Sequence, residues 1–165
     1  MIYCIYQISR TPVAPENYIA FCSIPESFFA TNAEYLVEET NRTDAIRQFF
    51  EAKKHIVVPG EDGESFTFIA HAKQTYFRRR HSEFVMKAAE LADVSIDAFV
   101  GITPYPIGTA MYELNRAYCD KFADYVMCDG ELTPFDQWLR DESLKGTYYI
   151  GGVLEYLYYF CEMRN

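Results

Sequence analysis

Residues 55-HIVVPGEDGESFTFIAHA-72 contain the clearest hairpin signal in the sequence. Residues 55–58 and 64–72 are rich in β-branched and aromatic side chains, which favour strands. Residues 59–63, Pro-Gly-Glu-Asp-Gly, have the composition of a turn. The stretch therefore predicts a β-hairpin, and with it a sheet that contains antiparallel strands.

The sequence before this hairpin predicts a mixture of strand and helix. Residues 1–9 are rich in Ile and Tyr and predict a strand. Residues 44–54 predict a helix, because their apolar side chains recur on one face. Ser23 and Glu26 have the spacing of a capping box, so helical structure, with or without a break near Thr31, is expected from there to about residue 39.

The C-terminal half is predicted to be mainly helical. Periodic apolar positions predict helices over residues 82–92, 109–128 and 134–144, with a long loop between the first two. Residues 147–161 fit either a buried helix or a hairpin that turns at a Gly-Gly pair, and the helix is favoured because its apolar residues recur at three- and four-residue steps.

Together these elements predict an α+β fold in which the N-terminal half supplies a small antiparallel sheet with helices packed on it. The length of 165 residues suits a single globular domain over residues 1–165. The aromatic share of 17% comes mostly from Tyr and Phe, and abundant Tyr suits cores and contact surfaces alike.

The ends of the sequence and its cysteines predict a cytoplasmic protein with no membrane segment. Residues 1–8 lack a basic leader followed by a long apolar segment. The longest apolar stretch, residues 147–161, contains Glu155 and is shorter than the roughly 20 residues that span a bilayer. The five cysteines are widely spaced, so reduced and mostly buried thiols are expected.

The net charge of −9 is unevenly distributed. Residues 1–87 contain 11 acidic and 10 basic side chains, whereas residues 88–165 contain 13 acidic and 5 basic ones. Direct nucleic-acid binding is therefore not expected, because it needs clustered positive charge. The asymmetry favours a protein partner with a basic surface.

Three carboxylates are the candidate partner-binding residues: Glu113, Asp120 and Asp124. On a helix over residues 109–128 they would lie opposite the apolar stripe, where a row of acids can imitate a phosphate backbone or dock on a basic groove. The alternative is a solvated helix face that serves only solubility.

The only basic cluster, Arg78, Arg79 and Arg80, supplies the candidate anion-binding residues. Guanidinium groups suit phosphate or carboxylate recognition. An intramolecular role, in which these arginines pair with the acidic C-terminal half, is an equal alternative.

No catalytic residue, metal site or cofactor is predicted, because the sequence lacks the spacings that bind zinc or cradle a nucleotide. Cys22 precedes a predicted helix, where a thiolate is favoured, but a buried structural thiol is the expected interpretation.

Three function classes remain open. The favoured one is a small acidic protein-binding module, in one version an inhibitor of the counter-defence type that occupies a nucleic-acid-binding surface. The second is a small enzyme that uses Cys22 with a histidine, or Tyr and Arg side chains of residues 76–81. The third is a self-associating structural subunit with an apolar patch formed by Tyr148, Tyr149, Tyr156, Tyr158 and Tyr159.

Overall fold

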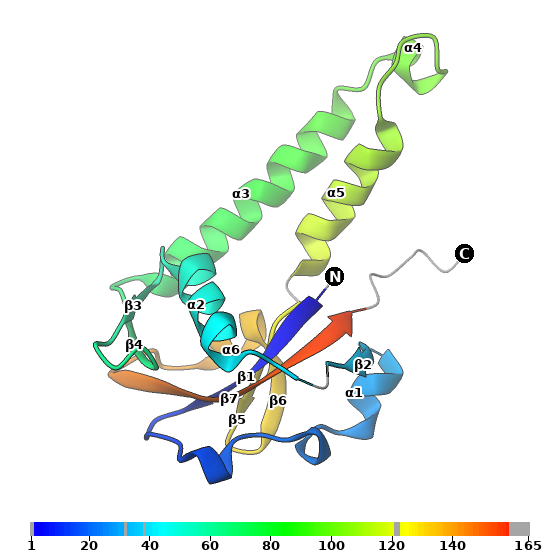
Figure 1. The fold of residues 1–165 in the computed structure, drawn as a ribbon. Helices are drawn as coiled ribbons and strands as arrows, with labels where there is room; N and C mark the ends of the chain where they lie inside the picture. The colour runs from blue at the N-terminus through cyan, green and yellow to red at the C-terminus, as the bar shows by residue number, and fades with distance from the viewer. Residues whose placement is uncertain (1, 32, 38, 121–122, 159–165) are drawn as a thin grey trace.

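The computed structural model describes residues 2–31, 33–37, 39–120 and 123–158, and a mixed sheet carries its fold (Figure 1). The strands of the sheet are β1 (Ile2–Ser9), β2 (Ala33–Leu36), β3 (Val57–Pro59), β4 (Ser65–Phe68), β5 (Tyr125–Cys128), β6 (Glu131–Pro134) and β7 (Thr147–Tyr158). Their order is β3-β4-β7-β1-β5-β6, and β2 also pairs with β7. The predicted α+β class is confirmed, but β1 and β5 run parallel, so the sheet is not purely antiparallel.

The helical elements lie on both faces of this sheet and on an arm that leaves it. They are the 3₁₀ turns η1 (Pro15–Asn17) and η2 (Phe21–Ser23), and the helices α1 (Glu26–Thr31), α2 (Arg42–Lys53), α3 (Ala72–Ala92), α4 (Ile96–Phe99), α5 (Ile107–Cys119) and α6 (Phe135–Asp141). Within the described residues, no helix combines the length and apolar character needed to cross a membrane.

Strand β1 is covered on both faces, which explains its almost continuous apolar sequence. Side chains alternate along a strand, so Tyr6 packs with Phe49 of α2 on one face, whereas Ile5 packs with the group around Phe28 of α1 on the other. Helix α6 joins the first of these cores through Phe135. The result is a central sheet between two layers.

The C-terminal half contributes three strands, so the prediction that it is mainly helical was wrong. Residues 147–158 form β7, which pairs with β1 on one side and with β4 and β2 on the other. Both a helix and a hairpin had been considered for residues 147–161, and the favoured helix is wrong for the residues described. Residues 159–161 lie outside them.

The Gly-Gly pair within β7 allows a close approach of other chain segments and makes no turn. The Gln7 side-chain oxygen accepts hydrogen bonds from the backbone N–H groups of Gly152 (2.7 Å) and Ile19 (3.1 Å). A Cβ on Gly151 would lie 2.5 Å from that same oxygen, and a Cβ on Gly152 would lie 2.7 Å from the Ile19 nitrogen. No side chain fits at either position without a shift of the surrounding structure.

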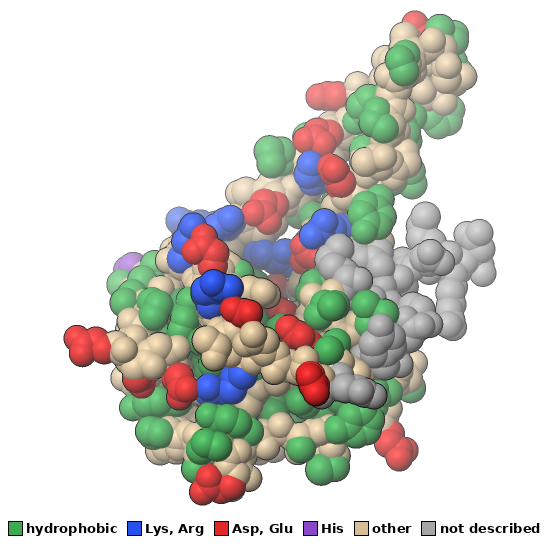
Figure 2. Space-filling view, viewed as in Figure 1, with side chains coloured by type: hydrophobic (Ala, Val, Ile, Leu, Met, Phe, Trp, Pro, Cys, Tyr) green, Lys and Arg blue, Asp and Glu red, His purple; other side chains and the backbone are tan. Residues whose placement is uncertain are grey.

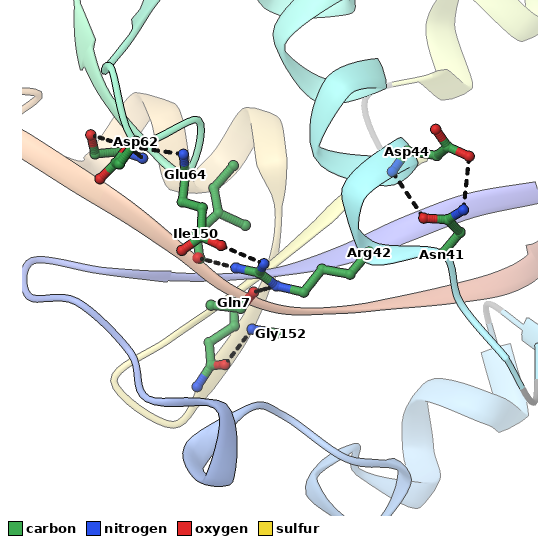
Figure 3. A network of polar contacts seen from close by, with 10 residues as sticks. Gln7, Asn41, Arg42, Asp44, Asp62, Glu64, Ile150 and Gly152 are labelled. Carbon is green, nitrogen blue, oxygen red and sulfur yellow. Dashed lines mark hydrogen bonds and ion pairs between the residues drawn. The ribbon is translucent and has the colours of Figure 1, made fainter.

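Arg42, at the start of α2, connects this helix to the sheet (Figure 3). Its guanidinium donates to the carbonyl oxygens of Gly151 (2.7 Å) and Ile150 (2.9 Å) and to the carboxylate of Glu64 (2.7 Å). The ring of Tyr18 lies 4.5 Å from the guanidinium carbon. One side chain thus fixes α2, β7 and the β3–β4 turn relative to one another.

Helices α3 and α5 form a hairpin that projects away from the sheet, with α4 at its outer end (Figure 1). The predicted helix at 82–92 is confirmed but begins earlier, at Ala72. The predicted helix over 109–128 ends at Cys119, and residues 125–128 form β5. The predicted loop between the two helices contains α4.

The remaining predictions agree with the structure in part. The strand near the N-terminus, the helix around residues 44–54 and the hairpin of β3 and β4 are confirmed. The helix expected from Ser23 to residue 39 is wrong beyond Thr31, because residues 33–36 form strand β2.

Candidate interaction site on the helical hairpin

Charged side chains of α2, α3, α5 and α6 converge where the helical hairpin meets the sheet. This region is called the root. The Arg80 guanidinium of α3 lies between two carboxylates, with Nε 3.5 Å from Asp136 Oδ2 and a terminal nitrogen 3.9 Å from Asp120 Oδ2. Tyr76, one turn earlier on α3, donates a 2.6 Å hydrogen bond to Asp136. Arg116 of α5 approaches Asp120 at 3.9 Å. The root therefore joins α3, α5 and α6 by charge.

Burial dominates the electrostatics of the root. It raises the pKa of Asp136 above the usual value of 3.8, although Tyr76 and Arg80 lower it. Burial likewise raises the pKa of Asp120, and this effect exceeds that of Arg80 and Arg116. The pKa of Tyr76 is raised by burial and by the neighbouring Asp136. Such shifts occur both in structural ion-pair networks and in functional sites.

A second ion pair at the root joins Lys53 of α2 to Asp124, at 3.6 Å. Asp124 also accepts a 3.2 Å hydrogen bond from the backbone N–H of Cys4, and the Lys53 ammonium lies 4.6 Å from the ring centre of Phe135. The side chain of Lys53 is only 11% exposed. A buried ammonium group needs an acidic partner, so Asp124 stabilises the fold by pairing with Lys53.

The three carboxylates predicted to bind a partner do not share one helix face. Glu113 lies within α5, Asp120 follows its last residue, and Asp124 lies beyond the helix, directly before β5. Each is paired within the chain, Glu113 with Lys87 at 2.8 Å and the other two as described above. The predicted arrangement is therefore wrong, and the part of these residues in partner binding stays a prediction.

The three candidate anion-binding arginines have different surroundings. Arg80 pairs with Asp120 and Asp136, as the intramolecular alternative proposed, and Arg79 pairs with Glu83 one turn along α3 at 3.3 Å. Arg78 is exposed and makes no ion pair among the residues that the structure describes. The three do not form one cationic site.

Two hollows flank Arg80. The larger, about 550 Å³, lies between α3, α5 and α6 and is lined by Phe77, Arg80, His81, Phe84, Ala117, Tyr118, Pro134, Asp136, Gln137 and Arg140. The smaller, about 250 Å³, lies on the α2 side of α3 and includes Tyr76 and His55. Neither includes Cys22, which is exposed in η2, so the expectation that this thiol is buried is wrong.

The groups expected for other kinds of site are dispersed or buried. Two of the five tyrosines expected in a surface patch, Tyr148 and Tyr156, are instead buried in the core, and Tyr149 is half-buried. The side chain of Tyr158 and the whole of Tyr159 lie outside what the structure describes. Among the described residues, no three His, Cys, Asp or Glu side chains are grouped so that they could hold a metal ion.

The outer end of the hairpin exposes large apolar side chains to solvent. The segment between α3 and α5, residues 93–106, is called the tip. In it, Ile96 is 81% exposed, Phe99 77%, Ile102 72% and Val100 58%. Figure 2 shows hydrophobic and acidic side chains together on this outer part of the arm. Exposed apolar groups gathered on one projecting element make the tip a candidate interaction site.

The apolar exposure continues along both helices of the hairpin. Ten of the fourteen large hydrophobic side chains that are exposed in the described residues lie between Val85 and Tyr118. On α3 only Ala72 and Tyr76 are buried, and on α5 only Ala110. The arm therefore has almost no core of its own beyond the root.

Sequence reasoning missed this site because it predicts a loop over residues 93–108 and assigns that loop no role. One signal was present: four large apolar residues, Ile96, Phe99, Val100 and Ile102, occur within seven positions of a segment expected at the surface.

Comparison with known proteins finds no matching family model, no similar curated protein and no similar solved structure. Functional inference therefore rests on the geometry of this chain alone.

Proposed function

We propose that the protein is a protein-binding module that acts by occupying a surface of a larger partner, and that its α3–α5 hairpin makes the contact. The observation that carries this proposal is the projecting tip with Ile96, Phe99 and Ile102 exposed. Side chains of this kind anchor interfaces when they enter a pocket on the partner.

The construction of the hairpin supports the same conclusion. Two helices in contact cover only one side of each other, and domains bury the other side against a further layer. Among the described residues no such layer covers the outer part of α3, where Val85 and Met86 are 47% and 56% exposed. A partner that packs on the arm supplies the missing cover.

The excess acidic charge of the C-terminal half bears on what such a module does once bound. An acidic protein that covers a basic surface competes with other anions for it, including nucleic acid. An inhibitor that occupies a nucleic-acid-binding surface is therefore the specific version of the proposal. The contact begins at the tip rather than at Glu113, Asp120 and Asp124.

Affinity capture with matched variants tests the proposal. The tagged protein, the Phe99→Ser variant and the Phe21→Ser variant are each incubated with lysate of the cell that makes the protein. Phe21 is the matched control because it is 64% exposed and lies in η2, outside the hairpin. We expect a partner that the wild type and Phe21→Ser retain and that Phe99→Ser loses.

Two results contradict the proposal. The first is a partner that all three proteins retain equally, since its contact would then lie elsewhere. The second is a partner lost by Phe21→Ser and retained by Phe99→Ser. Circular dichroism of both variants ensures that a loss of binding does not reflect unfolding.

A second candidate, small-ligand binding by an enzyme or receptor, has one observation in its favour. The larger hollow has the volume of a ligand pocket, and Arg80 and Asp136 meet aromatic side chains there. A thermal-shift screen with the Arg140→Ala variant as control tests it. Ligands that stabilise the wild type but not Arg140→Ala favour this candidate. A screen that finds no such ligand counts against it.

A further inference from the structure

The charges around the tip are of one sign. Residues 88–115 include four acidic residues, Glu90, Asp93, Asp97 and Glu113, and no Lys, Arg or His. The nearest basic residues in the sequence are Lys87 on α3 and Arg116 on α5. An apolar tip that is surrounded only by negative charge favours a partner surface that carries positive charge.

Two of these four acids are already paired, and two are not. Lys87 of α3 lies 2.8 Å from Glu113 of α5 and 3.7 Å from Glu90, so it connects the two helices. Hydrogen bonding to Glu113 raises the pKa of Lys87. Asp93 and Asp97 are exposed, and within the described part of the chain they make no ion pair. Their charges remain available to a partner.

Local hydrogen bonds hold the tip in shape. The Ser95 hydroxyl accepts from the backbone N–H of Ala98 (3.1 Å), and the carbonyl oxygen of Asp97 accepts from those of Ile102 (2.8 Å) and Thr103 (3.3 Å). Gly101 adopts a φ of 82°, which favours glycine. A tip that is already ordered loses little conformational entropy on binding.

From these observations, and resting on the proposed function, we propose that the tip enters an apolar groove on its partner that is bordered by Lys and Arg side chains. Phe99 and Ile96 fill the groove, and Asp93 and Asp97 meet its basic border. Apolar contact supplies most of the affinity, and the charges select the partner and speed association.

Two other occupants fit the charges less well. A second copy of the chain would bring two identical acidic tips together, so like charges would oppose the contact. An anionic lipid surface attracts Lys and Arg, and none occurs in residues 88–115.

Peptide display against the immobilised full-length protein tests the partner chemistry directly. Selected peptides are synthesised, and their affinities are measured for the wild type, Phe99→Ser and the double variant Asp93→Lys/Asp97→Lys. The double variant Glu16→Lys/Glu61→Lys is the matched control, because both residues are exposed acids on the body and the net charge changes equally. We expect peptides that combine apolar residues with Lys or Arg, and affinities about tenfold or more weaker for both tip variants only.

The outcomes separate the two proposals. If selected peptides depend on Phe99 but bind the Asp93→Lys/Asp97→Lys variant equally or more tightly, the basic border is wrong and the protein-binding function stands. If no selected peptide depends on Phe99, both proposals are overturned. Binding to vesicles of phosphatidylcholine with phosphatidylserine that requires Phe99 assigns the tip to a lipid surface instead. A concentration-dependent dimer lost in Phe99→Ser assigns it to a second copy.

Discussion

Arg80 on α3 and Asp136 on α6 form the contact that joins the projecting hairpin to the body, with 3.5 Å between Nε and Oδ2. Both side chains are largely buried, at 18% and 16% exposed, and Arg80 Nε makes no hydrogen bond in the described part of the chain. The attraction is therefore mainly that of two charges in a partly buried setting. Together with the hydrogen bond from Tyr76 to Asp136, this pair joins α3 to α6 at the root.

Replacing Arg80 should destabilise the protein. In Arg80→Met the carboxylates of Asp120 and Asp136 stay partly buried without the cation between them, so we expect the free energy of unfolding to fall by about 2 kcal/mol. Arg78→Met is the control, since Arg78 is exposed on the same helix. Urea denaturation measures both, and equal stabilities for the two variants would show that the ion pairs of Arg80 do not stabilise the root.

His55 should make the stability depend on pH. Partial burial, then the charges of Arg79 and Lys53, lower its pKa below the usual 6.5. Below about pH 6.5 the unfolded chain therefore binds a proton that the folded protein does not, and stability falls as the pH falls through that window. In His55→Phe, which keeps a ring against Tyr76, this component should vanish.

The difference between wild type and His55→Phe is the quantity to measure, by urea denaturation at several pH values. Asp120 and Asp136, whose pKa values are raised, act in the opposite direction at lower pH, where the folded protein binds protons first. That contribution is common to both proteins and cancels. A difference that does not change between pH 5 and 7 would contradict the assignment to His55.

Two glycines should respond in opposite ways to the same substitution. A Cβ at Gly152 would lie 2.7 Å from the Ile19 nitrogen, so Gly152→Ala should lower the free energy of unfolding by about 2 kcal/mol. No atom lies within 4 Å of a Cβ at Gly108, on α5, so Gly108→Ala should leave stability unchanged or raise it by about 0.5 kcal/mol. Thermal unfolding compares them, and a stable Gly152→Ala would refute the close packing described for β7.

Charge reversal should have different effects at the root and at the tip. Replacing Glu113, Asp120 and Asp124 by Lys breaks four internal ion pairs, so we expect a stability loss of at least about 2 kcal/mol. Asp93→Lys/Asp97→Lys breaks none that the structure records and should change stability by less than about 0.5 kcal/mol. A triple variant as stable as the wild type would show that the three acids behave as free surface charges.

The sequence predicted the elements whose signals are local. The β3–β4 hairpin and α2 follow from turn composition and apolar periodicity, and the structure confirms both. The error at β7 has a physical cause: its run of aromatic and aliphatic residues fits a buried strand as well as a buried helix, and only pairing with β1 and β4 decides. The same ambiguity extended the predicted helix of α5 into β5.

The candidate site was less predictable, because it depends on where the chain places side chains far apart in sequence. Acidity and Tyr content indicated a binding protein, but not which acids remain free. Asp120 and Asp124 were chosen for their helical spacing, and the end of α5 at Cys119 separates them. Asp93 and Asp97 carry the same carboxylate group, but they are exposed and make no ion pair among the described residues, whereas Asp120 and Asp124 are partly buried and paired.

Photo-crosslinking from position 99 shows whether the tip contacts a partner. A benzoylphenylalanine is placed at position 99, or at position 21 as the control, and the protein is irradiated in the cell that makes it. The account predicts a covalent adduct with one protein partner from position 99 and none from position 21. No adduct from position 99, or an adduct from position 21 alone, would contradict the claim that the hairpin tip makes the contact.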